Sequence, residues 1–197
     1  MKVLLTGFEP FGGESINPSW ETVKGIARIP AGMELIRLLL PVSFDKSRRV
    51  LKEAFREHAP DMILSLGQAG GRSGIHLERI AVNMMDARIA DNDGEKPRDE
   101  LLYPGEDNAL FSSLPLRKIE AALEEAGLPA QISNSAGLYV CNTVFYEAAR
   151  LVRAGRLKGA GFIHLPFLPE QAVKGEASLP LAEMIRAIEI VLKSLSE

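Results

Sequence analysis

Three residues that lie far apart in the chain have the chemistry of an acyl-transfer site: Glu78, Cys141 and His164. Cys141 is the only cysteine, and a cysteine thiolate is a strong nucleophile. Histidine has the pKa needed to accept the thiol proton and later to protonate a leaving group. The imidazole in turn needs an acceptor, normally a carboxylate, to fix its tautomer. These residue types predict a triad, but the sequence alone does not show that they meet.

Cys141 lies where a glycine-containing turn runs into an amphipathic helix. Apolar residues recur at helical spacing after Asn142, so Cys141 should occupy or precede the first helical turn. Unpaired N–H groups and the positive end of the helix dipole favour a thiolate there, which predicts a lowered thiol pKa. The alternative interpretation is that a lone cysteine is a small apolar residue of the core.

His164 and Glu78 are the candidate base and orienting carboxylate. His164 ends an apolar run, at the carboxyl edge of a predicted parallel strand, where α/β proteins build their sites. Glu78 interrupts an apolar strand, and acidic side chains are rarely buried without a partner. The alternative role for Glu78 is an ion pair with an arginine. Arg79 is a poor partner for it because adjacent strand residues face opposite sides. His58 and His76 are interpreted as structural or surface residues.

Short apolar runs alternate with helix-period segments along the chain, which predicts an α/β protein. The expected fold is a single-domain, three-layer α/β/α arrangement with a mainly parallel, twisted central sheet. The predicted strands are 2–8, 34–42, 62–67, 75–83, 131–133 and 161–165. Helices are expected after Ser19, Ser43, Pro115, Val140 and Ser178, with Ser19 and Ser43 as N-caps.

The gross properties exclude several classes of protein. A chain of 197 residues is long enough for one core, so 1–197 is expected to form one domain. A net charge of -3 does not indicate a basic surface that would bind nucleic acid. One cysteine excludes an intramolecular disulfide, and no apolar stretch has the length of a signal-peptide core or a membrane span. We therefore expect a cytoplasmic protein with no nucleic-acid or membrane partner.

Two loops carry further signals. The first loop places Phe8 and Phe11 on a turn without the spacing of a phosphate-binding loop, which suits an apolar pocket. The irregular stretch 84–114 is either a substrate-side excursion or a small hairpin at an interface. Within it, 91–95 superficially resembles a calcium loop but lacks the required ligand spacing. We expect no metal and no other cofactor.

Several motifs, in order along nearly the whole chain, resemble the pyrrolidone-carboxylate peptidases, also called pyroglutamyl peptidase I. The resemblance is carried by residues 6–13, 17–20, 65–72, 78–83, 86–89, 91–92, 140–142 and 164–166. It implies a cytosolic, generally tetrameric cysteine peptidase that removes an N-terminal pyroglutamyl residue from peptides. Cys141 would be the nucleophile, His164 the general base and acid, and Glu78 the residue that orients His164.

The resemblance also implies supporting residues. Arg88 matches an arginine near the active site that would help the oxyanion. The residues that match the pyroglutamyl pocket are Phe8, Phe11, Gln68, Tyr139 and Val140. Tyr139 stands where phenylalanine is expected, so it keeps the ring and adds a hydroxyl that needs a partner.

Two other functions remain open on the residues alone. An α/β fold would also suit a small-molecule phosphorylase, which would need an anion site of arginines and backbone amides. A binding module with Cys141 in its core is the second alternative, and it would resist thiol alkylation.

Overall fold

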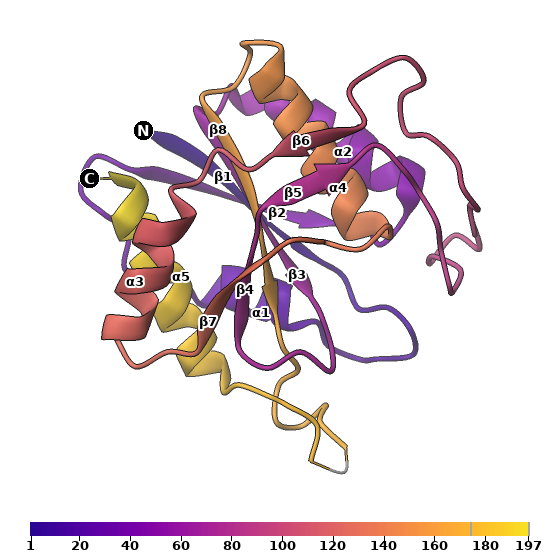
Figure 1. Ribbon diagram of the computed structural model, residues 1–197. Helices are drawn as coiled ribbons and strands as arrows, with labels where there is room; N and C mark the ends of the chain where they lie inside the picture. Colours follow the sequence, from indigo (N-terminus) through magenta and orange to yellow (C-terminus); the bar gives the residue numbers. More distant parts are fainter. Residues whose placement is uncertain (174, 197) are drawn as a thin grey trace.

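The computed structural model describes residues 1–173 and 175–196, and its centre is a six-stranded sheet. The strand order is β2-β1-β3-β8-β4-β7. The bounds are β1 (Lys2–Phe8), β2 (Glu34–Leu40), β3 (Met62–Gln68), β4 (Ile75–Glu78), β7 (Ala130–Ser133) and β8 (Gly159–Leu165). Neighbouring strands are parallel except for β4 and β8, which are antiparallel. The prediction of a mainly parallel, twisted sheet is confirmed (Figure 1).

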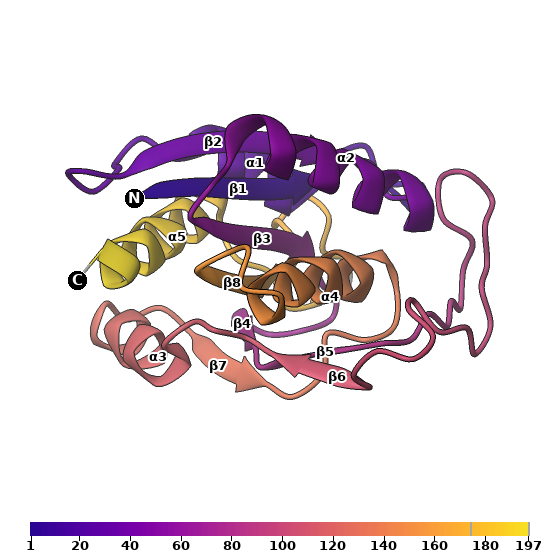
Figure 2. The same ribbon diagram turned by 90° about the horizontal axis from the view of Figure 1, so that it is seen from above.

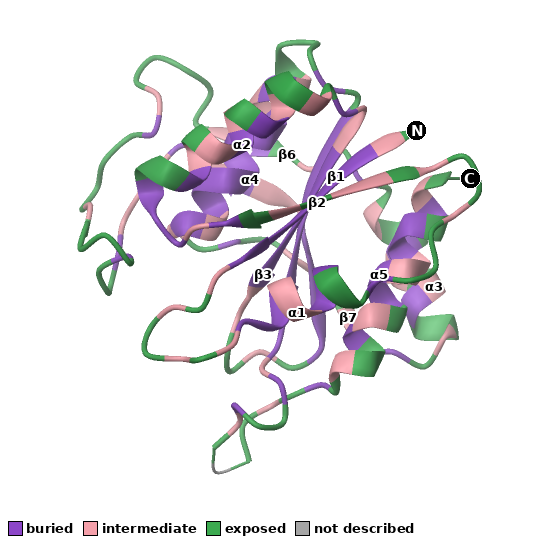
Figure 3. Cartoon of the chain, turned by 180° about the vertical axis from the view of Figure 1, so that it is seen from behind, coloured by how far each residue is buried: buried purple, intermediate pink, exposed green. Residues whose placement is uncertain are grey.

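Helices cover both faces of this sheet. One face carries α1 (Pro18–Gly25), α3 (Leu116–Glu125) and α5 (Leu181–Ser196), and the other carries α2 (Phe44–His58) and α4 (Val140–Arg153) (Figures 1 and 2). Alternate residues of β1 divide between the two cores. Val3 and Leu5 belong to the core on the side of α1, α3 and α5, whereas Leu4 belongs to the core on the side of α2 and α4. Figure 3 shows the inner strands of the sheet buried between helices that expose their outer faces. The three-layer α/β/α prediction is confirmed.

The helix starts follow local capping chemistry. Ser43 caps α2 as predicted, because its hydroxyl accepts a bond from the Lys46 N–H at 3.2 Å. The Ser19 prediction is wrong: Asn17 caps α1 and accepts from the Ser19 N–H at 3.0 Å. Pro18 favours this earlier start, since proline is well suited to the first helical position. The Ser19 hydroxyl instead accepts from the Phe8 N–H at 2.9 Å and ties the end of β1 to α1.

The predicted strand 75–83 is two strands in two sheets. β4 ends at Glu78, and β5 (Ile80–Val82) pairs antiparallel with β6 (Ala109–Phe111), which the sequence analysis missed. Between them, the Arg79 N–H donates to Ser133 O and the Arg79 carbonyl accepts from the Ser112 N–H, each at 2.8 Å. The chain therefore changes sheets immediately after Glu78.

The stretch 84–114 packs by its own polar contacts as well as through β6. The Asp91 carboxylate is buried and accepts backbone N–H bonds from Phe44, Asp93 and Glu95, each at 2.9 Å. The Asp91 carboxylate thus joins this stretch to the start of α2. Over 1–173 and 175–196 there is no group of three or more His, Cys, Asp or Glu side chains that could hold a metal ion.

No helix in the described part of the chain is both long enough and apolar enough to cross a membrane.

Candidate active site

Cys141 and His164 belong to the same face of the sheet. Cys141 is the second residue of α4, and a Cβ added to Gly67 on β3 would lie 2.8 Å from its sulfur. Gly67 is the register partner of His164 on β8, and paired residues of adjacent strands point to one face. The start of α4 therefore places the thiol over the strand pair that carries the imidazole.

His164 is bonded to Glu78 inside the sheet layer. The His164 Nδ1 lies 2.8 Å from Glu78 Oε1, and both residues are buried. β4 and β8 pair His76 with His164 and Glu78 with Phe162, so Glu78 projects to the same face as His164. A carboxylate partner selects the tautomer with its proton on Nδ1, which leaves Nε2 free to accept a proton. The predicted His164–Glu78 contact is present.

Cys141 is half-buried and its sulfur lies among apolar groups of the sheet. The Phe162 ring would also contact a Cβ at Gly67, at 2.7 Å, and its centroid lies 4.8 Å from that of His164. Desolvation raises the pKa of the Cys141 thiol to about 12, the Glu78 charge adds to the rise, and Arg72 opposes it. The expectation of a lowered thiol pKa is wrong, because lost hydration outweighs the helix terminus. The thiol is neutral at neutral pH.

The start of α4 is held by a buried amide and leaves its N–H groups uncapped by a side chain. The Asn142 Oδ1 accepts from Val82 N–H at 2.8 Å, and its Nδ2 donates to Val82 O at 2.8 Å and Met84 O at 3.0 Å. The N-cap residue Tyr139 makes no side-chain capping bond. Such a helix start offers N–H donors to a developing negative charge.

The aromatic residues predicted for a pocket separate into two groups. Phe11 lies beside Tyr139, with ring centroids 6.1 Å apart, and Phe44 packs edge-on against Tyr139 at 5.3 Å. The Tyr139 hydroxyl donates to Ala90 O at 3.0 Å, which supplies the partner that the sequence called for. Phe8 is buried in the core and lies beside Phe162, with ring centroids 6.3 Å apart. Two loops, through Phe11 and Ala90, and the start of α2 therefore meet at Tyr139.

The remaining predicted residues differ in their placement. Val140 is buried in the core at the helix start. Gln68 is half-buried, and its Oε1 accepts from Gln171 Nε2 at 3.1 Å. Arg88 is exposed and makes no hydrogen bond or ion pair within the part of the chain that the structure describes. No contact joins Gln68 or Arg88 to Cys141 among these residues, so their roles stay predictions.

The structure adds residues that the sequence analysis did not single out. Arg72 donates to Glu78 Oε1 at 2.9 Å, and Gly67 and Phe44 adjoin Cys141 and Tyr139, respectively. An arginine in a glycine-rich turn just before the strand of Glu78 was the available signal. His76 is buried beside this cluster, and desolvation lowers its pKa, in keeping with the expected structural role. His58 is the last residue of α2, also as expected.

Comparison with known proteins assigns this arrangement to a family. A family model described as Pyroglutamyl peptidase matches residues 1–197. A pyrrolidone-carboxylate peptidase of Thermococcus onnurineus is 47% identical over 196 residues, covering 98% of this chain and 98% of the relative. The pyrrolidone-carboxylate peptidase of Streptococcus suis is 46% identical, covering 100% of this chain and 93% of the relative.

Solved structures give the same result. Pyroglutamyl peptidase I from Bacillus amyloliquefaciens matches with a TM-score of 0.93 and 41% identity, covering 98% of this chain and 93% of that one. A mutant pyrrolidone carboxyl peptidase from Pyrococcus furiosus matches with a TM-score of 0.93 and 45% identity, covering 98% and 97%. These likenesses extend through the whole chain in sequence and in structure. The chain belongs to the pyroglutamyl peptidase family.

Proposed function

We propose that this protein hydrolyses the N-terminal pyroglutamyl residue from peptides as a cysteine peptidase, with 1–197 as its single catalytic domain. In this proposal Cys141 is the nucleophile, His164 the general base and acid, and Glu78 the residue that orients His164. The observation that carries the proposal is the 2.8 Å bond between His164 and Glu78. It lies on the sheet face where the start of α4 presents the only cysteine.

The neutral thiol determines how the reaction begins. Because the pKa of Cys141 is about 12, little thiolate exists before substrate arrives. His164 Nε2 takes the proton as the sulfur attacks the carbonyl carbon of the pyroglutamyl amide, and Glu78 stabilises the imidazolium. His164 then protonates the leaving amine as the C–N bond breaks, which leaves a thioester. Water, deprotonated by the same histidine, releases pyroglutamate and restores the thiol.

The tetrahedral intermediate carries a negative oxygen that needs donors. The first-turn N–H groups of α4 support this role, since the N-cap Tyr139 makes no side-chain capping bond. Arg88 is proposed as a further support for this oxygen on the strength of the motif 86–89.

The substrate's acyl group is a neutral lactam without an ammonium group, so its pocket needs apolar walls and a few matched hydrogen bonds. Phe11 and Tyr139 are the proposed walls, backed by Phe8 and Val140. The Gln68 carbonyl oxygen already accepts from Gln171. Its side-chain N–H groups are therefore the donors proposed to bind the lactam carbonyl. An acyl group without this carbonyl would leave the donors unpaired and would therefore react more slowly.

We infer that the enzyme works in the cytoplasm. A catalytic thiol must stay reduced, and the cytosol maintains thiols in that state. Cell fractionation tests this inference, and activity found only in an extracytoplasmic fraction would contradict it.

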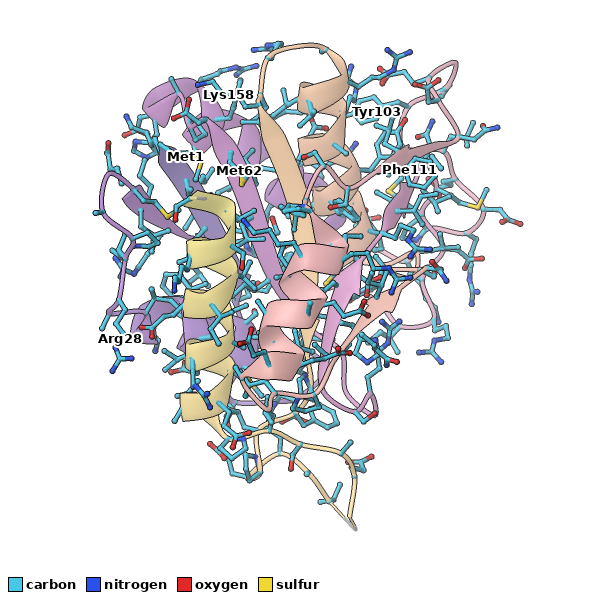
Figure 4. The ribbon with its side chains drawn as sticks, turned by 60° about the vertical axis from the view of Figure 1, so that its left-hand side comes forward. Met1, Arg28, Met62, Tyr103, Phe111 and Lys158 are labelled. Atoms are coloured by element: carbon cyan, nitrogen blue, oxygen red, sulfur yellow. The ribbon has the colours of Figure 1, made fainter. Side chains whose placement is uncertain are left out.

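We also propose that the chain assembles as a homotetramer. Support comes from large apolar side chains left exposed on one copy, which are Ile89 at 50%, Leu101 at 46% and Phe111 at 70%. Figure 4 shows Phe111 at the outer side of β6. Light scattering coupled to size exclusion should give four times the chain mass of 21.5 kDa. A monomer at micromolar concentration would contradict the proposal.

The catalytic assignment is tested with two chromogenic amides. The wild-type protein should hydrolyse L-pyroglutamyl p-nitroanilide, and Cys141→Ala should lower kcat by about 10⁴-fold or more. L-prolyl p-nitroanilide is the matched control, since its ring has a CH2 group in place of the lactam carbonyl and a charged ammonium in place of the lactam N–H. Activity retained by Cys141→Ala, or equal rates on both amides, would refute the assignment.

Gly67 should be required for the position of the nucleophile. In Gly67→Ala the new Cβ would meet the Cys141 sulfur at 2.8 Å, so kcat/KM should fall about 10²-fold. Gly161→Ala is the control, because its Cβ would meet Leu114 on the opposite face at 2.2 Å. Both variants should lose about 1–3 kcal/mol of unfolding free energy from overpacking. Equal losses of kcat/KM per folded molecule would rule out a specific role for Gly67.

Alkylation should report the neutral thiol directly, because Cys141 is the only cysteine. With a pKa of about 12, the iodoacetamide rate of the folded protein should rise about tenfold per pH unit from about pH 7 to about pH 10. The urea-unfolded protein should level off near an ordinary thiol pKa of about 8.5. A plateau below about pH 8 in the folded protein would show a preformed thiolate instead.

A further inference from the structure

Arg72 contacts the carboxylate that holds His164. Its Nη1 donates to Glu78 Oε1 at 2.9 Å, and the same oxygen accepts from His164 Nδ1 at 2.8 Å. The other carboxylate oxygen, Oε2, is buried and has no hydrogen-bond partner within 1–173 and 175–196. The orientation of Glu78 therefore depends on two contacts to one oxygen, and Arg72 supplies one of them.

The guanidinium also reaches the segment that leads to the nucleophile. Arg72 Nη2 donates to Ser135 O at 3.2 Å, and Nη1 lies 3.4 Å from Ser133 Oγ. Ser133 ends β7, and the chain then runs through Ser135 to Cys141 at the start of α4. A planar guanidinium holds several donors in a fixed fork, so one side chain can bridge these groups.

The turn between β3 and β4 has the backbone needed to bring Arg72 into this position. Gly71 and Gly74 have φ angles of 78° and 75°, a region that glycine adopts without steric cost. A Cβ on Gly70 would fall 2.0 Å from the ring of Phe167. Glycine at these three positions therefore lets the turn fold back beside Glu78.

Arg72 is the permanent charge in this cluster. The titratable groups around Glu78 are Arg72, His76 and His164, with Cys141 on the helix above. Desolvation lowers the pKa of His76, whose Nδ1 lies 3.4 Å from Arg72 Nη1, so His76 is neutral at neutral pH. A buried carboxylate that stays ionised needs a cationic partner. Among the described residues, Arg72 fills that place for Glu78.

We propose that Arg72 is a positioning residue that orients Glu78 against His164 and couples this carboxylate to the segment carrying Cys141. The inference rests on the proposed function of the triad. Because Arg72 acts through Glu78, its loss should lower kcat and leave KM nearly unchanged.

The first test compares Arg72→Gln with Arg79→Gln on L-pyroglutamyl p-nitroanilide. Arg79 follows Glu78 directly and bonds Asn134 Oδ1 at 2.9 Å, so it anchors the same segment without touching the carboxylate. Arg72→Gln should lower kcat about 10- to 100-fold, whereas Arg79→Gln should keep it. Wild-type kcat in Arg72→Gln, or an equal loss in both variants, would overturn the inference.

A conservative variant separates a loss of positioning from a loss of folding. Arg72→Lys keeps the charge, but one ammonium cannot span Glu78 and Ser135 as the fork does. Its kcat should fall between the wild-type and Arg72→Gln values, or about tenfold if Arg72→Gln does not fold. Wild-type kcat in Arg72→Lys would overturn the bridging geometry. Thermal unfolding of each variant gives the folded fraction used to correct kcat.

Two further readouts separate this inference from the proposed function. In a Glu78→Gln background, adding Arg72→Gln should change kcat by less than about threefold, since both act through one interaction. If Arg72→Gln lowers kcat in the Glu78→Gln background as much as it does in the wild type, Arg72 does not act through Glu78. Arg72 lowers the thiol pKa, so iodoacetamide should alkylate Arg72→Gln more slowly at a fixed pH; an unchanged rate would also count against it. A wild-type protein unable to cleave the amide would refute the proposed function itself.

Discussion

The burial of the Glu78 carboxylate is the constraint on which the rest of the site depends. A carboxylate with no exposure to water is costly unless charged or donor groups surround it. Here a single oxygen, Oε1, meets both His164 and Arg72. β4 runs antiparallel to β8 and places Glu78 opposite Phe162, which is two residues before His164 and lies on the same face.

Loss of hydration strengthens the Glu78 contacts and also affects the protonation of the Cys141 thiol. Hydrogen bonds of Asn142 hold the start of α4 in place, and Cys141 packs there beside Gly67 and Phe162. Desolvation then keeps the thiol protonated, with a pKa of about 12. In the proposed mechanism a neutral thiol requires His164 as its base, and His164 in turn depends on the buried Glu78 carboxylate that fixes its tautomer. In the proposed mechanism the thiol, the imidazole and the carboxylate therefore act together.

Much of the scaffold could be predicted from the sequence, because hydrophobic period and capping chemistry act locally. The bounds of β1 and the Ser43 cap followed from such patterns. The likeness in the motifs predicted the triad residues, of which His164 and Glu78 are in contact. The break at Arg79 could not be predicted, since apolar residues resume at Ile80 directly after the charged pair Glu78-Arg79. Its cause lies in bonds to Ser133 and Ser112, which are distant in sequence.

The thiol pKa and the contact of Arg72 were missed for a related reason. The helix terminus, which favours a lowered thiol pKa, involves only the backbone around Cys141. The desolvation that raises the thiol pKa comes from packing against residues of β3 and β8, which only the fold brings together. Arg72 likewise reaches Glu78 through a glycine turn whose direction the sequence pattern does not specify.

The most direct measurement of the central claim is a mutant cycle across the Glu78–His164 bond, with kcat for L-pyroglutamyl p-nitroanilide as the readout. Glu78→Gln alone should lower kcat by about 10²- to 10⁴-fold, and His164→Ala alone should lower it further. If Glu78 acts through His164, the double variant should be no slower than His164→Ala. A double variant slowed by the product of the two single effects would contradict the account.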